Sequence, residues 1–166
     1  MTKNYPARSK GGWYLARMGW LEWQETILKL GAIAAGITGF ALAFSTDRLA
    51  LPGGLGLVQF TILAIMSLGL FGAIFERLDQ REIGAMVFVL LNNLGHWGLL
   101  LALTSGLSGG LVIAFSALML AGDLTKLTFF ARSNFTVRNA TKALVLTIVS
   151  LFALGYAVIL ALEFFV

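Results

Sequence analysis

Five side chains that could do chemistry stand inside otherwise apolar runs of this sequence: Asn92, Asn93, His96, Asp123 and Lys126. The first three share the run VLLNNLGHWGLL, where spacings of three and four residues place both asparagines on the same side of a helix as His96. Amides and an imidazole can hydrogen-bond or hold a ligand, and a carboxylate near an amine can form an ion pair or carry a proton. What these groups do depends on the elements that position them.

Those elements are long apolar runs. The chain of 166 residues is 58% hydrophobic and only 12% charged, whereas a soluble domain is nearer half apolar and a quarter charged. A run of about 20 apolar residues is long enough for a helix to cross the hydrocarbon core of a membrane. Five such runs are present, at about residues 27–44, 55–75, 83–103, 111–130 and 143–165.

The runs predict an all-α integral membrane protein, a bundle of about five transmembrane helices in one domain over residues 27–166. A cytoplasmic arm over residues 1–26 precedes it. In this arm Trp13, Trp20 and Trp23 recur at helical spacing, while the charged residues lie off their stripe. The pattern predicts an N-terminal amphipathic helix in the cytoplasmic interface, where tryptophan is favoured, which anchors the first span.

The positions of Lys and Arg predict the orientation. With these spans, eleven of the twelve basic residues fall on the side of the N-terminus, and Arg48 alone falls on the other. Short loops rich in basic residues stay in the cytoplasm, so we expect the N-terminus inside and the C-terminus on the opposite side of a cell or inner membrane. Topology and anionic membrane lipids also explain the net charge of +4, and no nucleic-acid partner is expected.

Small residues predict where helices approach one another closely. Gly31, Ala35 and Gly39 fall on one face of the first span at intervals of four residues, and Gly69 and Gly72 share a face of the second. Helices in lipid associate through such small-residue seams. These seams favour packing within the chain, with a dimer interface as the alternative.

The asparagine and histidine side of the third span is predicted to be buried. At about 1.5 Å per residue, Asn92 and Asn93 lie about 14 Å deep, close to the midplane. An unsatisfied polar group in hydrocarbon costs several kcal/mol, so this side must face protein or water. Two interpretations stay open: hydrogen bonds that hold the bundle together, with Asp123 or Thr38 in reach, and a ligand or translocation site.

Asp123 is the sharper clue, because a carboxylate within a membrane span is rare. Lys126, three residues on, is its predicted partner. An ion pair between the two would make Asp123 structural. If Lys126 instead extends to the cytoplasmic surface, Asp123 could exchange a proton or bind a cation.

His96 has one further interpretation, as an axial ligand of a haem or chlorin, against the alternative of a hydrogen-bonded packing group. No other cofactor is predicted. The chain has no cysteine and one histidine, so thiolate sites and clusters of histidine ligands are excluded within one chain and no metal site is expected.

Enzymatic motifs are missing from the sequence. The leading expectation is therefore a non-enzymatic multi-pass membrane protein, a structural or accessory subunit that binds other membrane subunits or itself. One alternative is a small oligomeric carrier or channel that uses the polar layer in the middle of the membrane. The other is an intramembrane binder of a lipid, quinone or tetrapyrrole.

Overall fold

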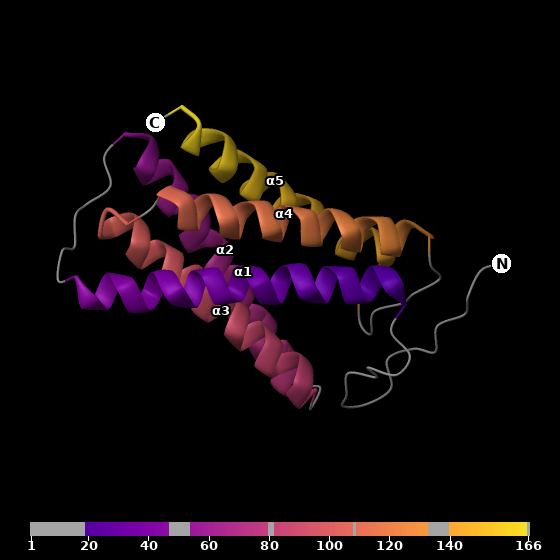
Figure 1. Ribbon diagram of the computed structural model, residues 1–166. Coiled ribbons are helices and arrows are strands. Elements are labelled where there is room, and N and C mark those ends of the chain that lie inside the picture. The colour runs from indigo at the N-terminus through magenta and orange to yellow at the C-terminus, as the bar shows by residue number, and fades with distance from the viewer. Residues whose placement is uncertain (1–18, 47–53, 80–81, 108, 133–139, 166) are drawn as a thin grey trace.

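The computed structural model describes residues 19–46, 54–79, 82–107, 109–132 and 140–165, which form five helices and no strand (Figure 1). Each helix is long and apolar enough to cross a membrane, as the sequence predicted. The helices are α1 (Trp20–Ser45), α2 (Leu55–Asp79), α3 (Ile83–Thr104), α4 (Gly109–Arg132) and α5 (Lys142–Glu163).

The largest difference from the predicted boundaries is at the start of α1. This helix begins at Trp20 rather than near residue 27 and continues without a break to Ser45. Glu22 stabilises its first turn, because its Oε2 accepts a hydrogen bond of 3.0 Å from the backbone N–H of Gly19. Glu25 and Lys29 therefore lie in the body of α1.

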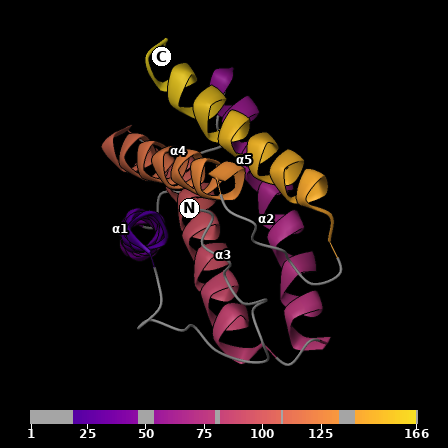
Figure 2. The ribbon, with the colours of Figure 1, turned by 90° about the vertical axis from the view of Figure 1, so that its right-hand side faces the viewer.

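The five helices close into a ring. Each packs on its neighbours in the order α1, α3, α2, α5, α4, and α4 returns to α1. Figure 1 shows α1 and α4 side by side, whereas the α2–α3 hairpin crosses them obliquely. Figure 2, viewed along α1, shows the loop end of this hairpin diverging from α1, α4 and α5. Apolar side chains fill the middle of the ring, among them Leu63, Leu99, Phe115 and Tyr156.

α1 and α3 cross in close backbone contact, and this contact depends on glycine. A Cβ added to Gly36 would collide with the backbone of Gly95, and one added to Gly98 would collide with the carbonyl of Gly36. Any larger residue would therefore push the two backbones apart. The small residues of α1 that contact α3 are thus Gly36 and Gly39. A Cβ added to Gly39 would lie 3.4 Å from the Cβ of Ala102.

The seams predicted from the sequence are corrected in part. Gly31 faces α4, where its added Cβ would lie 3.4 Å from Leu118, and Ala35 packs at the edge of the core. Gly69 faces Phe152 of α5 at 3.6 Å, but Gly72 has no neighbour within 4 Å in the described part of the chain. Both α3 and α4 pack against α1, from different directions. The small residues of α1 therefore contact two different helices and do not form one packing face.

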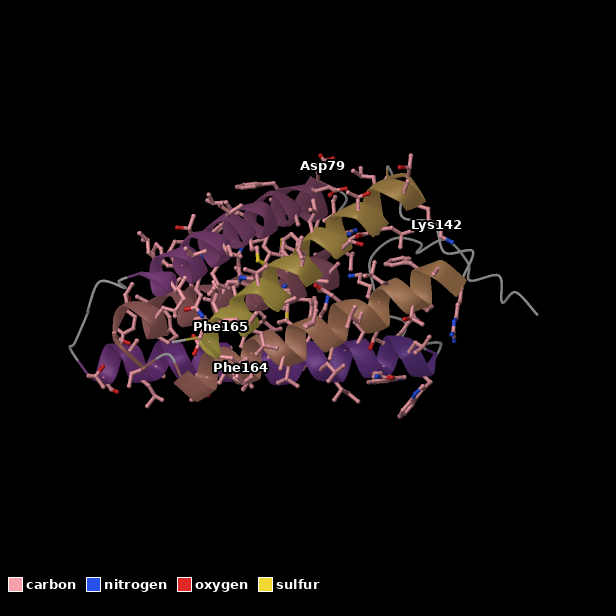
Figure 3. All side chains as sticks on the ribbon, turned by 90° about the horizontal axis from the view of Figure 1, so that it is seen from above. Asp79, Lys142, Phe164 and Phe165 are labelled. Atoms are coloured by element: carbon pink, nitrogen blue, oxygen red, sulfur yellow. The ribbon has the colours of Figure 1, made fainter. Side chains whose placement is uncertain are left out.

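The outer faces of the helices are apolar. Figure 3 shows side chains projecting all around the bundle, with Asp79 and Lys142 towards one end and Phe164 and Phe165 towards the other. Large hydrophobic residues such as Leu68 and Leu151 are 67% and 61% exposed. Many exposed large hydrophobic residues on long apolar helices are typical of contact with lipid or with other membrane helices.

The α1–α3 crossing generates a stability prediction. Gly98→Ala should destabilise the fold by about 1–3 kcal/mol or more, because the added methyl group meets backbone that cannot move aside. Gly72→Ala is the matched control and should leave stability within about 0.5 kcal/mol, because its site is open. Thermal unfolding of both variants in detergent measures the difference, and equal melting temperatures would contradict this packing.

Candidate functional site

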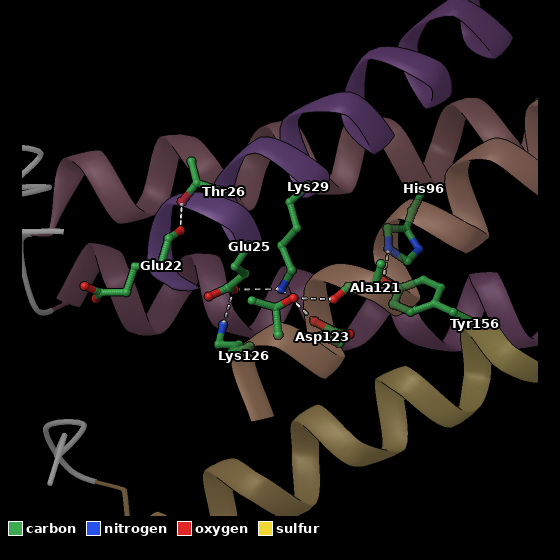
Figure 4. A network of polar contacts seen from close by, with 10 residues as sticks. Glu22, Glu25, Thr26, Lys29, His96, Ala121, Asp123, Lys126 and Tyr156 are labelled. Atoms are coloured by element: carbon green, nitrogen blue, oxygen red, sulfur yellow. Dashed lines mark hydrogen bonds and ion pairs between the residues drawn. The ribbon is translucent and has the colours of Figure 1, made fainter. Parts of the chain in front are cut away.

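The polar centre of the structure is a network of four charged side chains, two from α1 and two from α4 (Figure 4). Lys29 Nζ lies 2.7 Å from Asp123 Oδ1 and 3.1 Å from Glu25 Oε1. Lys126 Nζ lies 3.3 Å from the same Glu25 oxygen. The network contains two carboxylates and two amines, so it is neutral as a whole when all four are ionised.

Exposure falls steadily along this network. The side chain of Lys126 is 30% exposed and that of Glu25 is 16% exposed. Lys29 and Asp123 are only 7% and 4% exposed. The charges thus lead from the surface into the interior, and the pair at the inner end is buried. Each inner charge needs its partner, since an isolated ion is very costly in a low-dielectric interior.

Local geometry explains how the two helices meet at these charges. Glu25 and Lys29 are four residues apart on α1, so they share one face of the helix. On α4, Gly122 leaves room for the stem of Lys29, whose Cγ and Cε would lie 3.1 and 3.3 Å from an added Cβ. Thr125 points its hydroxyl to its own helix, at the carbonyl of Ala121. The stem of Lys29 therefore crosses α4 beside Gly122 and ends at Asp123.

The partner predicted for Asp123 is corrected by this geometry. Asp123 pairs with Lys29 of α1, while Lys126, the predicted partner, pairs with Glu25. The sequence interpretation missed both residues of α1, because Lys29 was counted among the eleven basic residues on the side of the N-terminus and Glu25 among the charged residues of the arm. The signal was present: Lys29 follows Glu25 by one helical turn and then stands within an apolar run, as Asp123 does.

Asn93 binds α2 rather than α4. In the amide orientation that gives both of its polar atoms a partner, Nδ2 donates to the Ser67 carbonyl at 3.1 Å and Oδ1 accepts from the Phe71 N–H at 3.2 Å. One side chain thus bridges two backbone groups one turn apart on α2. This contact fixes the position of α2 along α3.

His96 lies in an aromatic enclosure between α3, α4 and α5. Its Nε2 is 2.9 Å from the hydroxyl of Tyr156, and its ring meets Phe115 edge-on with centroids 5.2 Å apart. His96 and Tyr156 are both 0% exposed. Asn92, one turn before, is also buried, but its Oδ1 has no hydrogen-bond partner in the described residues.

The predicted polar residues therefore do not form one site. Asn93 faces α2, His96 faces α5, and Asp123 faces α1. Thr38, proposed from the sequence as a partner in reach, is exposed and bonds to Ala34 of its own helix. The histidine pair still adjoins the charge network: Figure 4 shows them side by side, and Tyr156 lies close enough to Asp123 to interact electrostatically.

A second buried polar contact, which the sequence reasoning did not identify, lies at the opposite end of the bundle. Gln59 of α2 donates from Nε2 to the carbonyl of Ile159 at 3.1 Å and to Glu163 Oε1 at 2.8 Å. It is 2% exposed and joins α2 to α5. The sequence did contain a sign of this contact, because Gln59 is a polar residue near the start of an apolar run.

The tryptophans predicted as anchors are described only in part. Trp20 and Trp23 lie in the first turn of α1 and are 78% and 37% exposed. Trp13 lies outside the described residues.

Comparison of this chain with models of protein families, with curated proteins and with solved structures finds no match.

The charge network generates a double-mutant prediction. Lys29→Met should destabilise the protein by about 3–5 kcal/mol, because it leaves Asp123 buried and unpaired. Adding Asp123→Asn should restore much of that loss, since Glu25 then still pairs with Lys126. Equilibrium unfolding of the single and double variants in detergent measures this coupling.

Lys126→Met is the control for position in the network. It should cost less than about 1 kcal/mol, because Lys126 is partly exposed and Glu25 keeps Lys29 as a partner. A Lys126 variant that is as unstable as the Lys29 variant, or a double variant with no recovery, would contradict the pairing described here.

Proposed function

We propose that this chain is a non-enzymatic multi-pass membrane protein that serves as a structural or accessory subunit of a larger membrane assembly. Its N-terminus lies in the cytoplasm and its C-terminus on the opposite side. The observation that carries the proposal is the way the buried charges are used. Lys29 and Asp123 neutralise each other across α1 and α4 at 2.7 Å, which serves to lock two helices together.

The α2–α3 hairpin supports a role in assembly. None of the described residues from 68 to 91 is buried, so the loop half of this hairpin stands away from the rest of the bundle. Its exposed apolar residues include Leu68, Phe75 and Ile83, each 67–69% exposed. Such a surface suits contact with lipid and with helices of a neighbouring subunit.

The orientation rests on the basic residues and on the tryptophans at the start of α1. Trp20 and Trp23 are exposed there, and residues at this position are suited to the headgroup region. A helix that lies in the interface, as the sequence of the arm predicts, would involve residues before Trp20 and therefore lies outside the described part.

A carrier is the second candidate, favoured by the polar groups that follow one another through the interior. The charge network, the His96–Tyr156 pair and the Gln59–Glu163 contact lie at successive depths of the bundle. For a tetrapyrrole on His96 the support is weaker, because Phe115 and Tyr156 already pack against the imidazole ring and Nε2 is hydrogen-bonded. These contacts favour a packing role for His96.

Native mass spectrometry of the full chain tests the proposed function. Gently solubilised from its own membrane, the protein should appear in a complex with other membrane subunits at fixed stoichiometry. Homo-oligomers alone would support the carrier, and a monomer that retains a lipid, quinone or pigment would support a binding protein. Either result would overturn the subunit proposal.

Reporter fusions test the orientation. A reporter active only in the cytoplasm should give signal at the N-terminus and none at the C-terminus, and a reporter active only outside should give the reverse, because the proposal has each of the five apolar helices cross the membrane once. A signal from both ends on the same side would require an even number of crossings.

A further inference from the structure

Lys29 lies between two carboxylates, whereas a simple ion pair requires only one. Its amine contacts two carboxylates at once, Glu25 at 3.1 Å and Asp123 at 2.7 Å. Both distances lie within the range over which a proton can move between hydrogen-bonded groups. A single buried amine thus joins an outer carboxylate to an inner one.

The outer carboxylate, Glu25, is partly exposed, whereas the inner one, Asp123, is buried. Glu25 is 16% exposed and contacts Lys126, which is 30% exposed. Asp123 is 4% exposed, and Lys29 fills the space between it and Glu25. A proton that reaches Asp123 from the Lys126 end therefore has Glu25 and Lys29 on its way.

The other ionisable groups around Asp123 are few within the described residues. On α5, Tyr156 lies close enough to Asp123 to interact electrostatically, and on α3 His96 bonds to that tyrosine at 2.9 Å. On its own helix Lys126 lies one turn away and pairs with Glu25. Lys29 contacts the Asp123 carboxylate directly, at 2.7 Å.

We propose that Lys29 is a proton relay that connects the partly exposed Glu25 with Asp123 in the interior of the bundle. A proton taken up by Glu25 forms an O–H bond on its carboxylate. Lys29 then gives one proton to Asp123, breaking an N–H bond and forming an O–H bond at Oδ1. Glu25 returns a proton to Nζ and is ionised again. The net result is one proton moved from solvent to Asp123, with Lys29 and Glu25 unchanged.

The relay rests on the same Lys29–Asp123 contact that supports the proposed function, but it needs no partner subunit, because every group belongs to one chain. It also differs from a purely structural lock in one chemical property. Lysine can release a proton, whereas the guanidinium of arginine stays protonated in proteins but can still pair with two carboxylates. Lys29→Arg therefore keeps the charges of the network and removes the relay.

The experiment is a pH jump on the full-length protein in lipid nanodiscs, followed by infrared difference spectroscopy. Acidification should produce the carbonyl signal of a protonated carboxylic acid that is absent in Asp123→Asn. In Lys29→Arg this signal should appear about 100-fold more slowly, as expected when a positioned proton donor is removed. The melting temperature measured alongside should stay close to that of the unchanged protein.

Two further variants complete the test. Glu25→Gln removes the outer carboxylate, keeps the Lys29–Asp123 pair, and should also slow the signal, which provides the decisive measurement if Lys29→Arg does not fold. Glu22→Gln is the matched control, because Glu22 lies one turn away on α1 and the described contact of its side chain is with the backbone N–H of Gly19. It should leave the rate unchanged.

Two results would overturn the relay. The first is protonation of Asp123 at the unchanged rate in folded Lys29→Arg or in Glu25→Gln. The second is the absence of any Asp123 signal down to the pH at which the protein unfolds, which would make the network a static lock. Neither result bears on co-purification with other subunits, so failure of the relay and failure of the proposed function can be told apart.

Discussion

The cost of holding charge in an apolar interior is the constraint on which this structure depends. Lys29 and Asp123 are nearly inaccessible to solvent, and a charge there is very costly unless it is paired. Their contact requires α1 and α4 to lie side by side in one axial register. Gly122 accommodates the stem of the lysine, so the backbone and the charges specify the same arrangement.

The contacts of α3 are of a different kind. It contacts α1 through glycines such as Gly98, where the two backbones pack closely. Towards α2 it offers the amide of Asn93, which bonds to the backbone, and towards α5 the imidazole of His96. Each interface of the ring thus has its own chemistry. Since the bundle is apolar throughout, these few specific contacts distinguish the observed order of helices from its alternatives.

The sequence predicts the elements well and the contacts between them poorly. Five apolar runs of sufficient length require five helices, and the ends of α2 to α5 fall within a few residues of the predicted spans. The burial of Asn93, His96 and Asp123 also follows, because a polar group in hydrocarbon must find a partner. Which partner it finds depends on the order and angles of the helices, and the apolar pattern carries little information on either.

Lys29 shows this limit. Spacing along one helix favours Glu25 as its partner, and spacing along α4 favours Lys126 as the partner of Asp123. Only the antiparallel contact of α1 with α4 brings Lys29 to Asp123. The same contact explains why a lysine near the end of an apolar run, which would extend to the surface in an isolated helix, is buried in the bundle.

The spacing of Glu25 and Lys29 on α1, and of Asp123 and Lys126 on α4, has a consequence for insertion into a membrane. Before α4 has been synthesised, Lys29 lacks Asp123, but Glu25 lies one turn away on the same helix, so α1 can carry both charges as a neutral internal pair. Asp123 and Lys126 offer α4 the same protection three residues apart. Assembly then exchanges partners between two pairs that were each neutral, and neither pair has to carry a lone charge into lipid.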